Sequence, residues 1–216
     1  MPPPYSDPAL VGYWNMDDYL PTTNVLDSSG NGNNGTAQQN TNVITTTDAV
    51  HNRALSFNGT SDYVSVGTTN LPTGASSRTV AFWTKRNSAS NFTYYPYPFY
   101  SGTKDLYKGF GMYGNINTTD MWFYGHSYDF DTGINLDDTN WHHIVLSFDG
   151  TNVMAYKDSS LISTTNRSLL NTVYGNFVIG SFLVSDQYWD GSIDDVRIYN
   201  RALSASEIYA QYLAGR

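Results

Sequence analysis

Apolar residues along the chain fall into short runs that are separated by clusters of Gly, Asn and Asp. The breaks include Asn58-Gly59, Asp149-Gly150 and Asp190-Gly191. Short runs bounded in this way are typical of β-strands, because these turn residues tolerate the backbone angles that reverse the chain. We therefore predict a meander of strands, with runs at residues 10–14, 54–57, 63–66, 80–83, 141–148, 153–156, 177–179 and 193–199.

The run at residues 141–148 carries apolar or aromatic side chains on both faces. Residues two apart in a strand share a face. One face holds Ile144, Leu146 and Phe148, and the other holds Trp141, His143 and Val145. A strand covered on both faces indicates two stacked sheets. Because Asp149-Gly150 follows this run, we also predict an antiparallel hairpin with 153–156, closed by two residues or by the longer turn 149–152.

A helix is predicted only at the end of the chain. Ser204 can cap it, and Glu207 stands three positions on, which is the spacing of a capping box. Its apolar stripe would consist of Leu203, Ile208, Tyr209 and Tyr212. We expect this helix to pack on the sandwich as a lid.

The composition agrees with an all-β chain. It includes 18 Tyr, 10 Phe and 5 Trp, whereas only 14% of the residues are charged. Aromatic residues favour pleated strands, so helical bundles, coiled coils and disordered tails are disfavoured. A length of 216 residues is compatible with one domain. We assign residues 1–8 to a Pro-rich leader and residues 9–216 to a single domain.

Charge and hydropathy argue against several classes of partner. The net charge is −8 with 11 Lys and Arg, so we expect no binding to nucleic acid and none to anionic lipid. No apolar run has the length of a membrane span, and the first residues lack the charged and apolar regions of an export signal. The chain has no Cys, which excludes disulfides and thiolate metal sites. Neutral ligands or cations are favoured as partners.

Six stretches of the sequence occur in an order that is similar to one family. They are GYWNMDD, VLDSSGNGNNGT, ALSFNGTSDYVSV, TVAFWTKR, NWHHIVLSFDGTNVMAYKD and WDGSIDDVRIYNRALSASEI, and they span residues 12–208. The ordered set resembles the laminin-G-like jelly rolls of the concanavalin A-like lectin/glucanase superfamily, although residues 87–135 match no motif. The resemblance implies an all-β fold, a two-sheet antiparallel jelly-roll sandwich, here with a short C-terminal helix.

A candidate metal site includes the glycine-rich segment 27–35. Oxygen-bearing side chains alternate there with glycines, which suits a hard cation such as Ca²⁺. The resemblance implies that this loop lies near the last strand, where the Gly-x-Ile-Asp pattern supplies a second carboxylate, with Asp195 next to it. The expected ligands of one structural Ca²⁺ are Asp27, Asn31, Asn33 and Asp194. The alternative is a set of glycine turns in which Asp and Asn cap their own backbone.

Residues 91–131 contain more aromatic rings than one sheet face can bury. Proline interrupts the segment 94–98, so its Tyr residues should lie on an edge or a loop. Exposed Tyr and Trp stack on sugars and also anchor protein partners. For any one ring, burial in the core is the simpler interpretation, but the cluster should leave a few rings exposed. The candidate contact rings are Tyr94, Tyr95, Tyr97, Trp122, Tyr124 and Trp189.

Catalysis has little support in the sequence. Glycanases of this superfamily use a pair of carboxylates on a Glu-containing strand. The chain has one Glu, Glu207, and it falls on the predicted terminal helix. The Asp pairs that could substitute in principle are Asp129/Asp131 and Asp137/Asp138. His142 and His143 point to opposite faces of their strand, so they cannot share one site.

These observations predict a non-catalytic binding module, extracellular or at the cell surface, that recognises a carbohydrate or a surface or matrix protein. A structural or assembly domain of an adhesin or phage-tail-like protein is the alternative, with its rings buried against a neighbour. A glycosidase that uses an Asp pair ranks third. Exposure of the rings at 94–130 separates the first two hypotheses.

Overall fold

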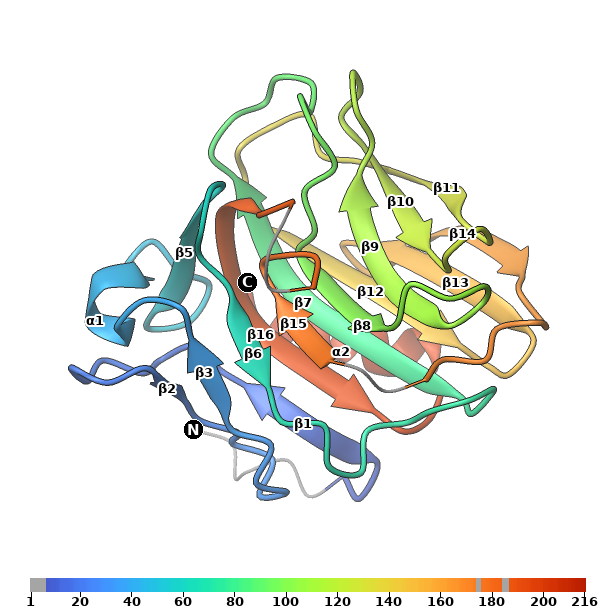
Figure 1. Ribbon diagram of the computed structural model, residues 1–216, viewed down its shortest axis with the longest axis horizontal. Helices are drawn as coiled ribbons and strands as arrows, with labels where there is room; N and C mark the ends of the chain where they lie inside the picture. The colour runs from blue at the N-terminus through green and yellow to red at the C-terminus, as the bar shows by residue number, and fades with distance from the viewer. Residues whose placement is uncertain (1–6, 174–175, 184–186) are drawn as a thin grey trace.

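Two eight-stranded antiparallel sheets stack face to face in the computed structural model, as Figure 1 shows. The structure describes residues 7–173, 176–183 and 187–216, so most of the predicted leader 1–8 lies outside the described residues. The first sheet contains β1 (Leu10–Trp14), β4 (Thr45–Thr46), β5 (Ala54–Asn58), β7 (Arg78–Arg86), β12 (His142–Phe148), β13 (Asn152–Lys157), β14 (Ser160–Asn166) and β16 (Asp190–Tyr199). The second contains β2 (Asn24–Val25), β3 (Gly35–Ala37), β6 (Val64–Val66), β8 (Phe99–Gly102), β9 (Gly109–Gly114), β10 (Asp120–Tyr124), β11 (Phe130–Asn135) and β15 (Asn176–Ile179).

The strand order shows how the chain crosses between the sheets. The first sheet runs β14-β13-β12-β7-β16-β5-β4, with β1 also paired to β16, and the second runs β11-β10-β9-β8-β15-β6-β3-β2. Helix α1 (Thr41–Ile44) is a single turn, and α2 (Ala205–Ala214) follows the last strand. The predicted all-β, two-sheet sandwich with a short C-terminal helix is confirmed.

Every predicted apolar run lies on a strand, although some ends differ by a residue or more. The predicted hairpin is also confirmed, because β12 and β13 pair antiparallel with Phe148 opposite Val153. Its turn is the longer form: the Asp149 amide donates to the Asn152 carbonyl over 3.2 Å. Gly150 supplies the positive φ, +100°, that this turn requires.

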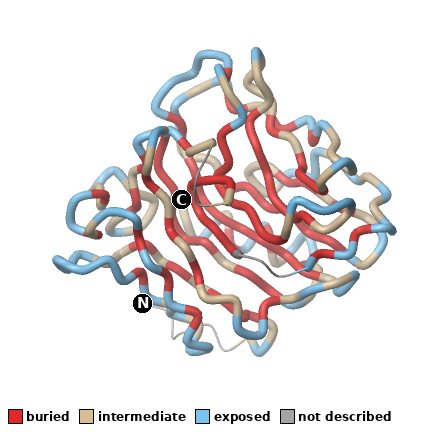
Figure 2. Tube along the Cα trace, viewed as in Figure 1, coloured by how far each residue is buried: buried red, intermediate tan, exposed pale blue. Residues whose placement is uncertain are grey.

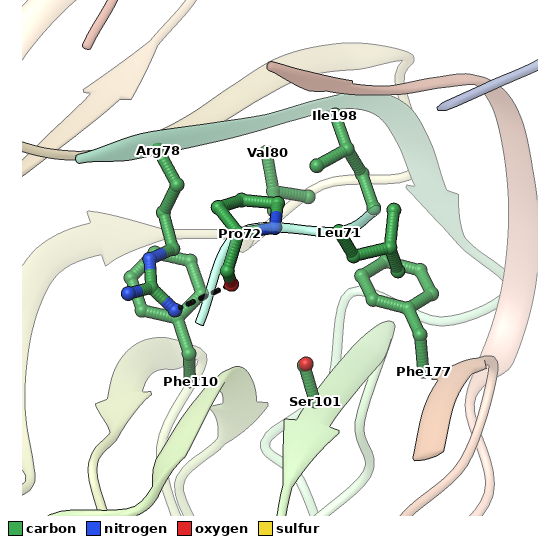
Figure 3. A pocket seen from close by; sticks show the side chains of 8 residues that line it. All are labelled: Leu71, Pro72, Arg78, Val80, Ser101, Phe110, Phe177 and Ile198. Atoms are coloured by element: carbon green, nitrogen blue, oxygen red, sulfur yellow. Dashed lines mark hydrogen bonds between the residues drawn. The ribbon is translucent and has the colours of Figure 1, made fainter. Parts of the chain in front are cut away.

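The space between the sheets is filled mainly by aromatic and aliphatic side chains, and Figure 2 shows most of the buried residues on the central strands. Rings from opposite sheets meet there, with centroids 5.6 Å apart for Phe82 and Phe99 and 5.8 Å apart for Trp14 and Phe177. A small hollow near Arg78 measures only about 10 Å³, which is the space of one water molecule. In Figure 3 the guanidinium of Arg78 lies against Phe110 and donates to the Pro72 carbonyl. The hollow is therefore a packing feature and too small for an organic ligand.

Helix α2 covers part of the outer face of the first sheet, as predicted. Leu203 and Ile208 pack there on Ala81, Val145 and other outward side chains of the sheet. The predicted capping box is present: Ser204 and Glu207 cap each other's main-chain N–H groups. No helix in the described ranges is both long and apolar enough to cross a membrane.

An ion-pair cluster joins this helix to the beginning of the described chain. Arg201 Nη2 lies 2.6 Å from a carboxylate oxygen of Asp7 and 2.7 Å from one of Glu207. The second guanidinium nitrogen donates to the other Glu207 oxygen over 2.9 Å. Arg201 therefore connects segments that lie almost 200 residues apart in the sequence.

His143 lies under α2 on the outer face of the first sheet and is 1% exposed. Its ring packs beside Trp83 and Tyr212, with centroid distances of 5.2 and 6.4 Å. Neither ring nitrogen has a hydrogen-bond partner within the described residues. Burial, together with the positive charge of Arg197, lowers the pKa of His143 from 6.5 to about 3. The imidazole is thus neutral in the folded protein at every pH above that value.

This histidine should make the protein less stable as the pH falls. Between pH 6.5 and about 3 the unfolded chain binds a proton at this position and the folded chain does not, so the free energy of unfolding decreases by up to about 1.4 kcal/mol per pH unit. The variant His143→Phe keeps a ring and lacks this titration. Relative to its own value at pH 8, it should retain about 2 kcal/mol more stability than the parent at pH 5 in urea unfolding. Parallel pH profiles for parent and variant would contradict this assignment.

Candidate functional site

The second sheet carries a layer of rings on the face that points away from the core. Phe99, Phe110 and Phe123 point inward, so their neighbours on β8, β9 and β10 point outward. Six rings gather on this outer face, which we call the aromatic cluster: Tyr97, Tyr100, Tyr113, Trp122, Tyr124 and Phe182. Tyr97 is at its centre, with ring centroids 4.7 Å from Phe182 and 5.3 Å from Tyr113.

Glycines on β9 make room for the cluster. Gly111 lies opposite Tyr100 on β8 and opposite Tyr124 on β10, and these two rings approach to 5.5 Å over it. A Cβ atom on Gly109 would lie 2.5 Å from the ring of Tyr124. A side chain at Gly109 would push the ring of Tyr124 away from the sheet, so the absence of a side chain there lets this ring pack over the strand.

The predicted contact rings divide into exposed and buried members. Tyr95 is 36% exposed at the margin of the cluster, and Tyr94 and Trp122 are half-buried. Tyr97 and Tyr124 are buried within the cluster, while Trp189 is fully buried in the core between the sheets. Tyr95 contacts Tyr113 edge to face at 5.8 Å, and Tyr113 contacts Trp122 at 6.3 Å. Only the Tyr95 and Trp122 ends of this row present substantial ring surface to solvent.

A carboxylate and an imidazole border the cluster at the turn between β10 and β11. Asp129 accepts the Gly125 amide over 2.8 Å and lies near the Tyr113 hydroxyl. Its burial raises the pKa of Asp129 above the ordinary range. The Tyr124 hydroxyl lies 2.6 Å from His126 Nδ1. Flat rings bordered by a carboxylate and an imidazole can stack on the C–H faces of a sugar while hydrogen-bonding its hydroxyl groups.

Three members of the cluster, Tyr100, Tyr113 and Phe182, are absent from the predicted set of contact rings. A signal for part of the cluster is present in GFGMYG at 109–114, where Gly alternates with large inward residues. Alternating glycines in a strand indicate close approach on one face. No comparable signal marks Phe182, which reaches the cluster from a loop.

The candidate metal ligands lie in two settings. Asp27 caps its own turn: one carboxylate oxygen accepts the amides of Tyr13 and Ser29, and the other accepts that of Asn33. Asn31 and Asn33 donate their side-chain amides to the carbonyls of Leu10 and Val11. These bonds attach the loop to β1.

Asp194 is fully buried in β16, where a register shift between Asp194 and Arg197 disturbs the pairing with β7. One oxygen accepts the amides of Val50 and His51 over 3.0 and 3.1 Å. The other, Oδ1, is buried without a hydrogen-bond partner within the described residues. Burial, reinforced by the neighbouring charge of Asp195, raises the pKa of Asp194 to about 8. A buried oxygen without a partner is a position where a cation would fit.

A second carboxylate borders the same loop as Asp194. Asp17 accepts the Arg53 amide and the Asn52 side chain, each over 3.1 Å, directly after the two residues that bind Asp194. Asp195, the other predicted candidate, is engaged elsewhere, because it accepts from Tyr13 over 2.6 Å and from Arg197 over 3.1 Å. Within the described ranges, no three acidic or imidazole side chains are grouped as a metal site.

The members of the Asp pairs considered for catalysis differ in exposure and in hydrogen-bond partners. Asp129 is half-buried against Tyr113, whereas Asp131 is exposed and accepts the Gly133 amide. Asp137 is exposed, and Asp138 bonds to His142 Nε2 over 3.0 Å. His142 also contacts Asp158, so it is part of a surface ion-pair cluster, and His143 is buried on its own.

Comparison with known proteins finds a similar sequence in a carbohydrate-active enzyme. The chain is 22% identical over 224 residues to an alpha-L-arabinofuranosidase of Bifidobacterium longum, covering 91% of this chain but only 20% of that enzyme. It therefore spans about a fifth of that relative's length.

The fold is shared with solved structures of an arabinanase domain and of a toxin binding domain. Domain 4 of AbnA, an extracellular GH43 arabinanase from Geobacillus stearothermophilus solved with arabinotriose, matches with a TM-score of 0.71 and 21% identity, covering 93% of this chain and 97% of that domain. The binding domain of botulinum neurotoxin DC, solved with rat synaptotagmin II, matches with a TM-score of 0.71 and 14% identity, covering 96% and 52%.

A family model described as the concanavalin A-like lectin/glucanases superfamily matches residues 58–209. This match covers both halves of the sandwich, from the end of β5 into α2. It agrees with the ordered motifs and with the two stacked sheets. The chain therefore belongs to the concanavalin A-like lectin/glucanases superfamily, as a laminin-G-like domain.

Proposed function

We propose that this chain is a carbohydrate-binding module, and that the margin of the aromatic cluster is its contact surface. The observation that supports this most is the row Tyr95, Tyr113 and Trp122, with Asp129 beside it. Its rings are already packed against one another, so they would lose little conformational entropy when a ligand stacks on them. A sugar could place its C–H face on Trp122 or Tyr95 while a hydroxyl group donates to Asp129.

The ligand that we propose is an arabinose-containing oligosaccharide. Support comes from the similarity to an arabinanase domain solved with arabinotriose and to part of an arabinofuranosidase. In this proposal the chain is an ancillary domain of a larger extracellular protein that acts on such polysaccharides. A protein partner, as in the neurotoxin complex with synaptotagmin II, is the alternative for the same surface.

We also propose that the domain itself is not catalytic. Glu207 is the single Glu, and its carboxylate is held by Arg201 and Ser204 as part of the helix cap. These hydrogen bonds lower the pKa of Glu207 to about 2, which suits a permanent anion and not a general acid. Incubation with arabinan should release no reducing ends. Release that disappears in Asp129→Asn would overturn this part of the proposal.

Removing a ring at the margin of the aromatic cluster should weaken sugar binding without unfolding the protein. Stacking contributes on the order of 1 kcal/mol per ring, so Trp122→Ala and Tyr95→Ala should each raise the Kd for arabinotriose roughly fivefold in calorimetric titration. Tyr209→Ala is a matched control, because Tyr209 is 52% exposed on α2, on the other side of the molecule. This control should bind like the parent.

Two results would contradict the surface assignment. Unchanged affinity in the Trp122 and Tyr95 double variant would mean that the ligand lies elsewhere. No binding to any arabinose-containing glycan, combined with self-association that Trp122→Ala abolishes in light scattering, would favour the assembly hypothesis instead.

We further propose that a structural Ca²⁺ binds at Asp194, with Asp17 as the second carboxylate on the same loop. The unpaired, buried Oδ1 of Asp194 supports this choice. Asp27 fits the capping role better than a metal site, because its two oxygens accept three main-chain amides. Those of Asp17 accept one main-chain amide and two side-chain amides. Main-chain carbonyls and water would supply the remaining oxygen ligands. The ion would join the 50–53 loop to β16 and would take no part in chemistry.

Calcium should stabilise the parent and fail to stabilise an Asp194 variant. At a Ca²⁺ concentration of about 100 times Kd the expected gain is about 2.7 kcal/mol, or a Tm rise of roughly 5–10 °C. Asp194→Asn should show no rise, and without Ca²⁺ at pH 7 it should be about as stable as the parent, because the raised pKa of Asp194 already leaves its carboxyl group largely uncharged. Asp27→Asn should lower the Tm and keep the calcium response. An identical response in parent and Asp194→Asn would contradict this site.

A further inference from the structure

A second hollow lies at the loop end of the sandwich, where β5 and β7 end and β16 begins. The 87–98 loop, the green segment at the top of Figure 1, forms one wall of it. Its volume is about 160 Å³, which is close to the ~150 Å³ that holds one benzene ring in an apolar cavity. The hollow is therefore large enough for one ring-sized unit. Unlike an apolar cavity, it is lined by charged and polar groups as well as by Phe92 and Pro96.

Arg86 supplies buried hydrogen-bond donors to this cavity. The residue is 6% exposed, and its guanidinium lies 3.8 Å from the centroid of the Phe92 ring. It donates to the carbonyls of Leu136 and Ser90 over 2.7 and 2.5 Å. A guanidinium has five N–H donors, and within the described residues these bonds use two of them. The group is thus held in place while it keeps donors for a ligand.

Asp190 and Tyr94 supply acceptors to the same cavity. Asp190 is exposed, and its Oδ1 is held by the Asn87 side chain over 2.7 Å. The Tyr94 hydroxyl donates to the Tyr188 carbonyl over 2.9 Å, which leaves its oxygen as an acceptor. Gly59 makes this arrangement possible, because a Cβ there would lie 2.9 Å from the Asp190 side chain and 3.0 Å from the Tyr94 hydroxyl.

The opposite charges of the residues that line the cavity indicate which class of ligand it favours. An anion would meet Asp190 and a cation would meet Arg86, so neither is favoured throughout the cavity. A neutral ligand with adjacent hydroxyl groups can accept from the guanidinium with one oxygen and donate to the carboxylate with the next. The half-buried ring of Tyr94 offers an amphipathic wall for its C–H groups. A sugar residue has this combination of groups in a single ring.

We propose that this cavity binds one neutral sugar residue through a vicinal diol that bridges Arg86 and Asp190. The proposal rests on the carbohydrate-binding function proposed above and adds a second site, separate from the aromatic cluster. The cavity takes a single residue, whereas the row of rings on the sheet face suits an extended chain. The domain would then bind a glycan at two sites, the loop-end cavity and the aromatic cluster.

The test is an NMR titration of the whole ¹⁵N-labelled chain with arabinotriose. The amides of Gly59 and Asn91 report on the cavity, and the amide of Gly111 reports on the aromatic cluster. In the parent both sets should shift. Asp190→Ala should raise the Kd read from Gly59 and Asn91 at least about tenfold and leave the Gly111 response unchanged. Trp122→Ala should raise the Kd read from Gly111 roughly fivefold and leave the Gly59 and Asn91 responses unchanged.

Controls separate this inference from the proposed function. Asp105→Ala removes another exposed carboxylate and should leave both responses as in the parent, while an otherwise unchanged spectrum of Asp190→Ala shows that it folds. Shifts at Gly111 without shifts at Gly59 and Asn91 would overturn the cavity site and keep the carbohydrate-binding function. Cavity shifts that persist unchanged in Asp190→Ala would overturn the diol arrangement. Shifts at neither set would overturn both proposals for this ligand.

Discussion

The pairing of β16 is the constraint on which most of the molecule depends. Along one edge β16 pairs with β7, and its other edge is shared by β5 for residues 190–193 and by β1 for residues 196–199. The register shift lies where the second edge changes partner. One extra residue at such a point turns neighbouring side chains to new directions. This irregularity places Asp194 against the 50–51 loop and Asp195 against Tyr13 on β1.

The same strand contributes residues to both the loop-end cavity and the buried carboxylate site. Its first residue, Asp190, lines the loop-end cavity, and its middle carries the buried carboxylates. The segment 94–98 then divides the cavity from the aromatic cluster. Tyr94 lines the cavity and Tyr97 lies under Phe182, while the Pro96 carbonyl accepts the Gly114 amide from β9. Proline suits this segment, since a loop that crosses a sheet face needs a stiff backbone more than ladder hydrogen bonds.

The parts of the fold that could be predicted are those with an unambiguous pattern. In β12, alternation on both faces predicted two sheets, and Asp149-Gly150 predicted its partner strand. In β9 the outward positions 109 and 111 are glycines, so the alternation that would reveal a strand is incomplete. In β14 most side chains are exposed and polar, which leaves little apolar signal.

The sites were harder to predict for two reasons. They depend on which alternate side chains of a strand face the core, and on contacts between residues far apart in the sequence. An aromatic strand does not reveal which alternate set faces the core, so Trp189 was expected to contact ligand and is instead fully buried between the sheets. The segment at 27–35 has the composition of a metal loop, yet its carboxylate is used by amides of the same turn and of β1. The loop-end cavity is lined by Arg86, Tyr94 and Asp190, two of them about 100 residues from the third in the sequence, so no local motif predicts it.

The bridge through Arg201 implies that the two ends of the described chain open together. Asp7 is tied to the residues just before β1, because it accepts the Ala9 amide, and Glu207 is tied to the first turn of α2. Fraying at either end therefore removes a partner of the same guanidinium. Local opening proceeds in cooperative units held by shared contacts. The amides of β1 and α2, at opposite ends of the sequence, should consequently behave as one such unit in hydrogen exchange.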